Sequence, residues 1–274
     1  KLKAIIIDEL KAISKKYGTP RKTGIVYASE LEEPDEDEQV EDYAVTLFLS
    51  CEGYFKKITA QSLRMSGEQK YKDGDGLAVS FESTNRAELL FLTDKQQMYK
   101  ARVSDFEDGK ASVLGIYLPT RLKMDEGESV IAMIDPGDYK KHLLLMFENG
   151  KAARIELSAY ETKTNRRKLV GACSDKSPVK AVMLIGEEFD VACYSSDGRA
   201  LIFNTAQLQP KTSRSTQGVA VMSLKAKRVL ERALPLKDSD IQNAARYRVR
   251  SIPAAGALIK GEDRAEKQLS LMDE

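Results

Sequence analysis

The side chains in this sequence that could do chemistry are lysines and arginines, because they recur at related places along the chain. Lys56, Lys100 and Arg154 each lie shortly after a predicted tight turn. Phosphates lie densely along a nucleic-acid duplex and release counterions when neutralised, so cations repeated on one face could bind such a backbone. The candidates for these contacts are Lys56, Lys57, Arg64, Lys70, Lys72, Lys100, Arg102, Arg154, Arg166, Arg167, Lys168, Arg199, Lys211 and Arg214. For each of them, the alternative is a solvated surface charge.

The sequence contains few groups suited to catalysis or metal binding. Its single histidine, His142, begins an apolar run and is expected to be structural. No Cys/His spacing matches a zinc site, and no phosphate loop of the Walker type is present. The stretch Asp73-Gly74-Asp75-Gly76 lacks the glutamate of a calcium-binding EF-hand, so it is better explained as a turn. We therefore expect no catalytic residue, no metal site and no cofactor in this chain.

The net charge of +1 conceals an uneven distribution. Residues 30–42 contain nine acidic residues and no basic one, and residues 260–274 contain five acidic and three basic residues. The body between them, 43–259, contains 33 Lys and Arg against 26 Asp and Glu. A moderately basic body with acidic flanks fits a protein that binds a polyanion, and an ordinary mixed surface fits the same charges equally well.

Cysteine usage and hydropathy indicate a reducing compartment and no membrane partner. Cys51, Cys173 and Cys193 are isolated and odd in number, as expected of free thiols in the cytoplasm. No run of about 18 apolar residues is present, and the first residues lack the apolar core of a signal peptide. Because the chain does not begin with Met, we expect it to be a piece of a longer protein.

Two kinds of hydrophobic pattern divide the chain. Apolar residues at helical spacing predict one helix over Leu2–Tyr17, and Gly18 is a plausible stop. From Tyr43 onward the pattern changes to short strands with period-two alternation. We expect a junction helix and strand in 1–29, an acidic linker in 30–42, an all-β domain in 43–259 and a polar tail in 260–274.

The all-β part contains a repeated hairpin. Each unit is an apolar strand, a tight polar turn and a second strand, and the turns at Gly53, Gln96, Gly150 and Gly198 lie 43, 54 and 48 residues apart. Asn149-Gly150 and Asp197-Gly198 are strong hairpin signals, because these residues tolerate positive φ. A repeat of this length holds about four strands and predicts the blade of a closed, propeller-like domain. Four units are clear, and a partial fifth is possible in 238–259, which leaves a smaller or open ring as the alternative to closure.

The junction helix and the hairpins together resemble a known family. Ile7–Gly18, followed by Pro20-Arg21-Lys22-Thr23, looks like the last helix of the breakage-reunion region in the A subunits of bacterial type IIA DNA topoisomerases. Glu52–Ile58, Asp197–Ala200 and Arg214–Val219 look like the repeated blade motif of the C-terminal domain that follows it in DNA gyrase and topoisomerase IV. The resemblance covers nearly all of residues 2–235.

The resemblance implies a β-pinwheel of about four to five blades, in which neighbouring blades exchange strands. It also implies a basic rim that binds and bends double-stranded DNA with little sequence preference. The domain would present the transported DNA segment to the cleavage gate, together with the ATPase B subunit and the rest of the A subunit. The full enzyme would be an ATP- and Mg²⁺-dependent isomerase in the bacterial cytoplasm, associated with the nucleoid and with no membrane. The cleaving tyrosine of the family lies upstream of this helix, so no active site is expected here.

One stretch separates the two enzymes of the family. Gyrase has a Gln-Arg-Arg-Gly-Gly-Lys-Gly-type box in its first blade, which it needs to wrap DNA. The corresponding residues 65–76 keep glycines and two lysines but lack the paired arginines and add acids. This departure favours topoisomerase IV, which decatenates and relaxes DNA, and leaves a divergent gyrase as the alternative. A propeller that binds proteins is a further alternative, although the chain contains no Trp and no WD40 signature.

Overall fold

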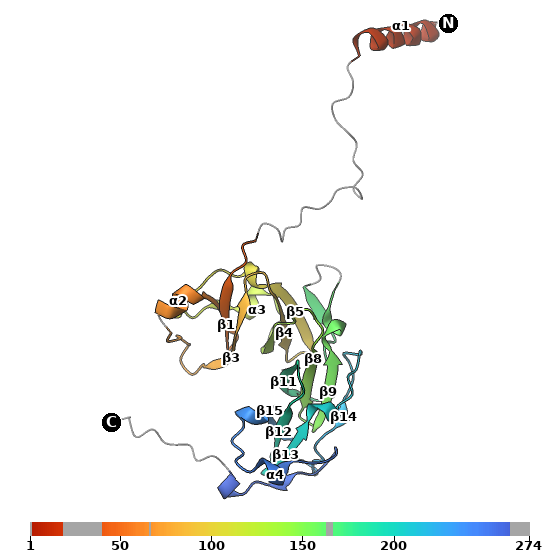
Figure 1. Ribbon diagram of the computed structural model, residues 1–274. Helices are drawn as coiled ribbons and strands as arrows, with labels where there is room; N and C mark the ends of the chain where they lie inside the picture. Colours follow the sequence, from red (N-terminus) through yellow and green to blue (C-terminus); the bar gives the residue numbers. More distant parts are fainter. Residues whose placement is uncertain (1, 19–39, 66, 163–166, 264–274) are drawn as a thin grey trace. The chain divides into compact units, whose positions relative to one another are not determined.

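The computed structural model describes residues 2–18, 40–65, 67–162 and 167–263 (Figure 1). The chain divides into two units, 1–40 and 41–274. In the first unit, α1 (Leu2–Tyr17) confirms the predicted helix, and all of its residues are exposed. The predicted acidic linker and polar tail lie mostly outside the described residues, so their boundaries stay predictions.

The second unit consists of short strands that form four antiparallel sheets (Figure 1). The sheets have the strand orders β3-β1-β2-β6, β7-β4-β5-β10, β11-β8-β9-β14 and β15-β12-β13-β16, and we call them the first to the fourth sheet. The strands are β1 (Ala44–Ser50), β2 (Tyr54–Thr59), β3 (Leu77–Thr84), β4 (Glu88–Thr93), β5 (Gln97–Arg102), β6 (Ile116–Tyr117), β7 (Val130–Ile134), β8 (His142–Phe147), β9 (Lys151–Glu156), β10 (Lys168–Val170), β11 (Val179–Ile185), β12 (Asp190–Ser195), β13 (Arg199–Asn204), β14 (Val219–Ala220), β15 (Leu230–Pro235) and β16 (Ala257–Leu258). The short helices are α2 (Ala60–Met65), α3 (Leu118–Arg121) and α4 (Ala244–Tyr247), and the 3₁₀ turns are η2 (Val103–Asp105), η3 (Leu157–Tyr160), η4 (Thr205–Gln207), η5 (Leu236–Asp238) and η6 (Gly261–Asp263).

The hairpin turns have the geometry that their sequence requires. Gly53, Gly150 and Gly198 have φ of +88°, +77° and +75°. Gln96 occupies the equivalent place in the second hairpin and also has a positive φ, +55°. The second turn therefore adopts the left-handed conformation without a glycine, and the predicted alignment of the four hairpins is confirmed.

Neighbouring sheets exchange a strand. Strand β6 follows the β4–β5 hairpin of the second sheet in the chain, but it pairs with β2 of the first sheet, Tyr54 opposite Tyr117. In the same way β10 returns to the second sheet and β14 to the third. The exchange that the family resemblance implied is therefore present.

The segment predicted as a partial fifth repeat completes the fourth sheet instead. Its strand β16 pairs with β13, Arg199 opposite Leu258, in the place that β6, β10 and β14 take in the other sheets. The helix α4 places Tyr247 in the apolar cluster that backs the fourth sheet. The described residues therefore form four blades, the lower end of the expected range.

A glycine precedes three of the exchanged strands because the backbones approach closely there. Gly115, Gly218 and Gly256 have φ of +96°, +70° and +69°. A Cβ on Gly218 would lie 2.2 Å from the carbonyl oxygen of Ala152, and the other two glycines would meet the equivalent oxygens on β2 and β13. These glycines let the chain cross onto the hairpin of the preceding sheet.

Substituting Gly218 should therefore destabilise the domain more than substituting a glycine in an open turn. Gly198→Ala forces a side chain into the left-handed region, at a cost of about 1–2 kcal/mol. Gly218→Ala adds a backbone clash, and we expect a further loss of about 1–3 kcal/mol in the free energy of unfolding. Thermal or urea unfolding of the two variants checks this, and equal losses would contradict the close approach.

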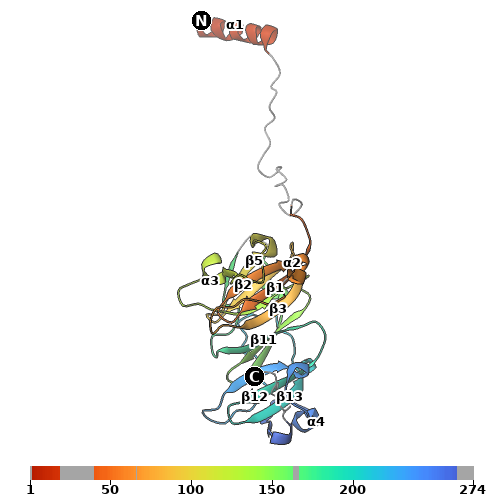
Figure 2. The same cartoon turned by 90° about the vertical axis from the view of Figure 1, so that its left-hand side faces the viewer.

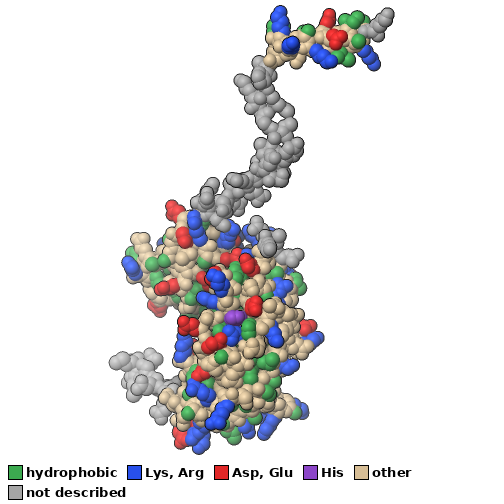
Figure 3. All heavy atoms as spheres, turned by 45° about the vertical axis from the view of Figure 1, so that its right-hand side comes forward, with side chains coloured by type: hydrophobic (Ala, Val, Ile, Leu, Met, Phe, Trp, Pro, Cys, Tyr) green, Lys and Arg blue, Asp and Glu red, His purple; other side chains and the backbone are tan. Residues whose placement is uncertain are grey.

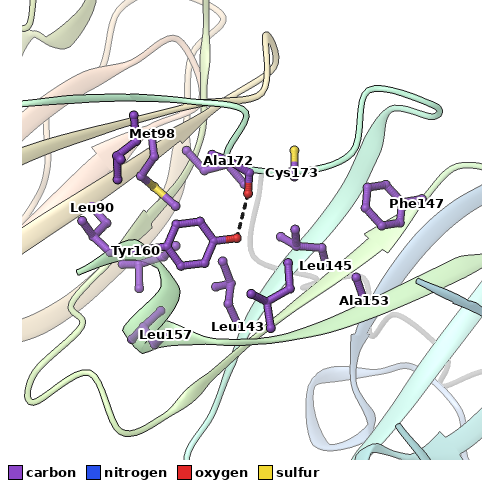
Figure 4. Packing of buried hydrophobic residues seen from close by; sticks show 14 residues of the cluster. Leu90, Met98, Leu143, Leu145, Phe147, Ala153, Leu157, Tyr160, Ala172 and Cys173 are labelled. Carbon is purple, nitrogen blue, oxygen red and sulfur yellow. Dashed lines mark hydrogen bonds between the residues drawn. The ribbon is translucent and has the colours of Figure 1, made fainter. Parts of the chain in front are cut away.

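The core consists of apolar layers between adjacent sheets. Successive residues of a strand face opposite sides, so Leu89 and Phe91 pack towards the first sheet while Leu90 packs towards the third. This explains why β4 and β8 have almost uninterrupted apolar sequences. Figure 4 shows the layer between the second and third sheets, where the Tyr160 hydroxyl donates a hydrogen bond of 2.7 Å to the carbonyl of Ala172.

The layers follow one another along the chain and do not close into a ring. Buried clusters join the first sheet to the second, the second to the third and the third to the fourth. Within the described ranges, no such cluster joins the fourth sheet to the first. A cavity of about 980 Å³ lies between β3 of the first sheet, β11 of the third and the end of β15 of the fourth. The four sheets are therefore arranged as an arc (Figure 1; Figure 2 shows the same sheets turned by 90°), and the buried core has the open arrangement rather than the closed one.

Candidate nucleic-acid interface

Three of the predicted DNA-binding residues are buried and cannot line an exposed rim. Lys56, Lys57 and Arg154 are 4%, 4% and 9% exposed. The Lys56 ammonium donates hydrogen bonds to the backbone oxygens of Lys70 at 2.6 Å and Ala111 at 3.2 Å. Burial lowers the pKa of Lys56. The prediction that these three side chains contact phosphates is therefore wrong, because each is used inside the protein.

The strand register also corrects which cations are equivalent. Lys57, Lys100 and Arg154 each occupy the fourth position of the second hairpin strand, so Lys57 and not Lys56 is the repeated residue. Each of the three pairs with a carboxylate, at 2.9 Å to Asp108, 2.5 Å to Glu88 and 2.8 Å to Glu188 respectively. The cation at this repeated position therefore forms a structural ion pair in each of three successive sheets.

Arg154 shows what this position does. Its guanidinium contacts Glu188, just before β12, and donates to the backbone oxygens of Thr205 at 3.3 Å and Leu208 at 3.4 Å. It therefore ties the third sheet to the fourth. The Nδ1 of His142 lies 3.3 Å from the same guanidinium, and desolvation together with this cation lowers the pKa of His142. The geometry agrees with the structural role expected of His142.

A second group of candidates is partly exposed and pairs with acids at the surface. Lys72 contacts Glu52 at 2.7 Å, Lys168 contacts Asp125 at 2.9 Å, and Arg199 contacts Asp197 at 3.4 Å. Exposed pairs of this kind contribute about 0–1 kcal/mol, so a phosphate could displace the carboxylate at little cost. Figure 3 shows the same mixture, with Lys and Arg side chains interspersed with Asp and Glu over one face.

The remaining candidates are more open. Arg64, Lys70, Arg167 and Lys211 are exposed, and none of them has an ion pair with another residue in the described part of the chain. Arg102 and Arg214 are half-buried. Arg166 lies outside the described residues.

The structure reveals a different repeated cation, at the outer edge of each sheet. Strand β11 packs beside β7 and β15, and each of these strands lies at one end of its sheet, which we call the inner edge. The short strands β6, β10, β14 and β16 lie at the opposite end of each sheet, which we call the outer edge. Each segment that leads to an outer strand runs along the second strand of a hairpin and bonds to its backbone. In three sheets the segment donates the hydrogen bond: Gly109 N to Lys57 O, Lys211 N to Arg154 O, and Val249 N to Ile202 O. In the second sheet the direction is reversed, and Arg167 O accepts from Lys100 N. An exposed cation lies at or beside each contact: Lys110, Arg167, Lys211 and Arg250. We call these four residues the outer-edge cations.

Sequence reasoning missed Lys110 and Arg250. No local pattern singles them out, because their equivalence depends on hydrogen bonds to hairpins about 45–55 residues earlier in the chain. It also missed Arg121 and Lys123. These two line a cavity of about 180 Å³ together with Lys100, Arg167 and Asp105.

The described residues contain no group of three or more His, Cys, Asp or Glu side chains placed to hold a metal ion. No helix among them is long and apolar enough to cross a membrane. All three cysteines are free, and burial raises the pKa of Cys173 to about 11.

Comparison with known proteins shows which family these features are similar to. The family described as "DNA gyrase C-terminal domain, beta-propeller" matches residues 87–135 and 190–228. The DNA gyrase A subunit of Borreliella burgdorferi is 22% identical over 244 residues, covering 86% of this chain and 30% of that protein. The DNA topoisomerase 4 A subunit of Staphylococcus epidermidis is 26% identical over 245 residues, covering 87% of this chain and 30% of that protein. The chain thus spans about 30% of the length of these relatives.

Solved structures have the same fold. The C-terminal domain of DNA topoisomerase IV superimposes with a TM-score of 0.63 at 23% identity, covering 74% of this chain and 64% of that chain. The C-terminal domain of E. coli ParC gives 0.58 at 16% identity, covering 81% and 96% of the two chains. With its four strand-exchanged sheets and a family model that matches residues 87–135 and 190–228, the chain is similar to the C-terminal domains found in the A subunits of DNA gyrase and topoisomerase IV.

Proposed function

We propose that the chain binds and bends double-stranded DNA along the outer edges of its four sheets. The observation that carries the proposal is the repeated exposed cation at each outer edge, Lys110, Arg167, Lys211 and Arg250. Four sheets in an arc place these charges at successive positions, so a duplex that contacts several of them has to follow the arc. The contacts involve phosphates, so we expect little dependence on base sequence.

We further propose that the whole protein is the A subunit of a type IIA topoisomerase. In it this domain would present the transported DNA segment to the cleavage gate, in the bacterial cytoplasm near the nucleoid. Cleavage, Mg²⁺ and ATP would be handled by the ATPase B subunit together with the rest of the A subunit. This domain would contribute DNA geometry and no catalytic group of its own.

Within the family, we propose topoisomerase IV and keep a divergent gyrase as the alternative. Residues 65–76 lack paired arginines, and one of their two lysines, Lys72, pairs with Glu52. The other, Lys70, has its backbone N–H bonded to the carbonyl of Ala111 and its side chain exposed. A single open cation in this stretch supports weaker DNA wrapping than a box with several.

The test is the change in linking number when a nicked plasmid is religated with the bound domain. We expect a measurable shift that is smaller than the shift given by a gyrase C-terminal domain at the same ratio of protein to DNA. A gyrase-sized shift would contradict the topoisomerase IV assignment. Binding without any shift in linking number and without bending of short duplexes would contradict the proposed path along the arc.

A further inference from the structure

A small cationic cavity opens between the outer parts of the first and second sheets. It has a volume of about 180 Å³, and its lining includes Lys100, Arg121, Lys123 and Arg167. Arg121 ends α3, which follows β6 of the first sheet, and Lys100 belongs to β5 of the second sheet. The cavity therefore lies where two sheets meet, with cations contributed from both sides.

Three of these cations form no ion pair with a carboxylate. Lys100 is neutralised by Glu88 at 2.5 Å. Arg121 donates to the backbone oxygen of Asp105 rather than to a carboxylate, and neither Lys123 nor Arg167 forms an ion pair with any residue that the structure describes. The single carboxylate in the lining, Asp105, accepts a hydrogen bond from the backbone of Arg102 at 3.2 Å and offsets one positive charge. Three cations against one carboxylate leave the cavity positive, so it attracts an anion.

The side chain of Arg121 and the backbones of Lys123 and Arg167 are held in place. The Arg121 guanidinium lies 6.0 Å from the ring centroid of Phe106, which is 2% exposed, and bonds to the carbonyl of Asp105. Lys123 follows α3 with a φ of +52°, and its N–H donates to the carbonyl of Thr120 at 3.3 Å. Arg167 is fixed through its carbonyl, which accepts from Lys100 N at 2.8 Å. The Arg121 guanidinium therefore loses less conformational entropy on binding than a free side chain does.

The volume decides the class of ligand. Cavities that hold drug-sized molecules measure about 300–1,000 Å³, so about 180 Å³ is too small for a nucleoside. Arginine presents a planar fork that matches two oxygens of a phosphate, and lysine adds a point charge. We propose that this cavity is a phosphate-binding socket, with Arg121, Lys123 and Arg167 as its ligands.

The phosphate can come from two sources with the same chemistry, a DNA backbone phosphodiester or free inorganic phosphate. The DNA source rests on the proposed function, because a duplex along the outer edges passes Arg167. In that case the socket fixes one phosphate at the junction of the first two sheets and sets where the duplex starts along the arc. The test therefore needs one arm for each source.

The variant is Arg121→Gln with Lys123→Gln, and the matched control is Arg228→Gln with Lys227→Gln. The control removes an exposed Lys–Arg pair in which the lysine, with φ of +62°, has the same left-handed backbone as Lys123. In the first arm, inorganic phosphate is titrated into ¹⁵N-labelled protein, and the arginine Nε–Hε signals are followed by NMR. In the second arm, affinity for a duplex of about 40 base pairs, long enough to span several phosphate contacts, is measured across salt.

We expect millimolar phosphate to shift the Arg121 signal in the wild-type domain and in the control. We also expect the socket variant to bind DNA on the order of 10-fold or more weaker at low salt, with a salt slope lower by about 1–2. A phosphate shift without an effect on DNA assigns the socket to free phosphate. No phosphate shift, and DNA binding equal to that of the control, overturns the socket while leaving salt-dependent DNA binding by the wild-type domain intact. Loss of DNA binding by the wild-type domain itself would overturn the proposed function instead.

Discussion

Replacing Lys110, Lys211 and Arg250 with glutamine should weaken DNA binding by about two orders of magnitude while leaving the fold intact. These outer-edge cations are exposed and form no ion pair within the described residues, so their removal leaves no buried acid unpaired. Each phosphate contact contributes about 0.9 to the slope of log K against log salt, so the slope should fall by about 3. At about 0.1 M salt this corresponds to a loss on the order of 10²-fold.

The control is a triple variant of exposed lysines in segments that do not lead to outer strands, Lys140→Gln, Lys176→Gln and Lys225→Gln. It removes the same net charge, so it has the same effect on the overall field of the protein. We expect it to lose only a few-fold in affinity, with an almost unchanged slope. If the two triple variants lose affinity equally, binding depends on net charge and not on the outer edges.

Arg154→Met should lower stability and leave DNA binding almost unchanged. The substitution removes a buried guanidinium and leaves the carbonyls of Thr205 and Leu208 without this donor at the joint between the third and fourth sheets. Unsatisfied buried groups cost about 1–3 kcal/mol, and Glu188 is 41% exposed and can be rehydrated, so we expect a loss of about 2 kcal/mol. For a domain of this size, the melting temperature should fall by about 4–8 °C.

Lys140→Met is the matched control for stability. Lys140 also pairs with a carboxylate, Asp138 at 2.6 Å, but its side chain is 82% exposed. Its removal should change stability by less than about 0.5 kcal/mol. A DNA affinity of Arg154→Met reduced as strongly as that of the outer-edge variant would restore Arg154 to the DNA interface and contradict its structural role.

The hairpins could be predicted from the sequence because their signals are local. Period-two alternation and turn residues such as Asn149-Gly150 indicate strand, turn and strand within about 14 residues. The exchange of strands could not be predicted in detail, because β6, β10, β14 and β16 are only two or three residues long and pair with hairpins far back in the chain. For the same reason, residues 238–259 looked like part of a fifth repeat, because their pairing with β13 far back in the chain leaves no local signal.

The basic character of the site could be predicted, but the positions of its members could not. A sequence shows charge without showing burial, so Lys57 and Arg154 looked like rim residues although both are buried and paired with Asp108 and Glu188. The repeated position was also misplaced by one residue in the first hairpin: the sequence suggested Lys56, and the strand register shows Lys57. The exposed repeat, by contrast, lies on crossing segments with no shared local motif, and only the backbone contacts reveal it.

The most direct test of the account is the affinity of the unaltered domain for double-stranded DNA across salt concentrations. The measurement uses duplexes of equal length and different base sequence, titrated between about 50 and 200 mM salt. We predict that log affinity falls linearly and steeply with log salt and is nearly the same for all sequences. Binding that is absent at about 50 mM salt, or that does not respond to salt, would contradict the claim that this domain holds DNA through cations along its outer edges.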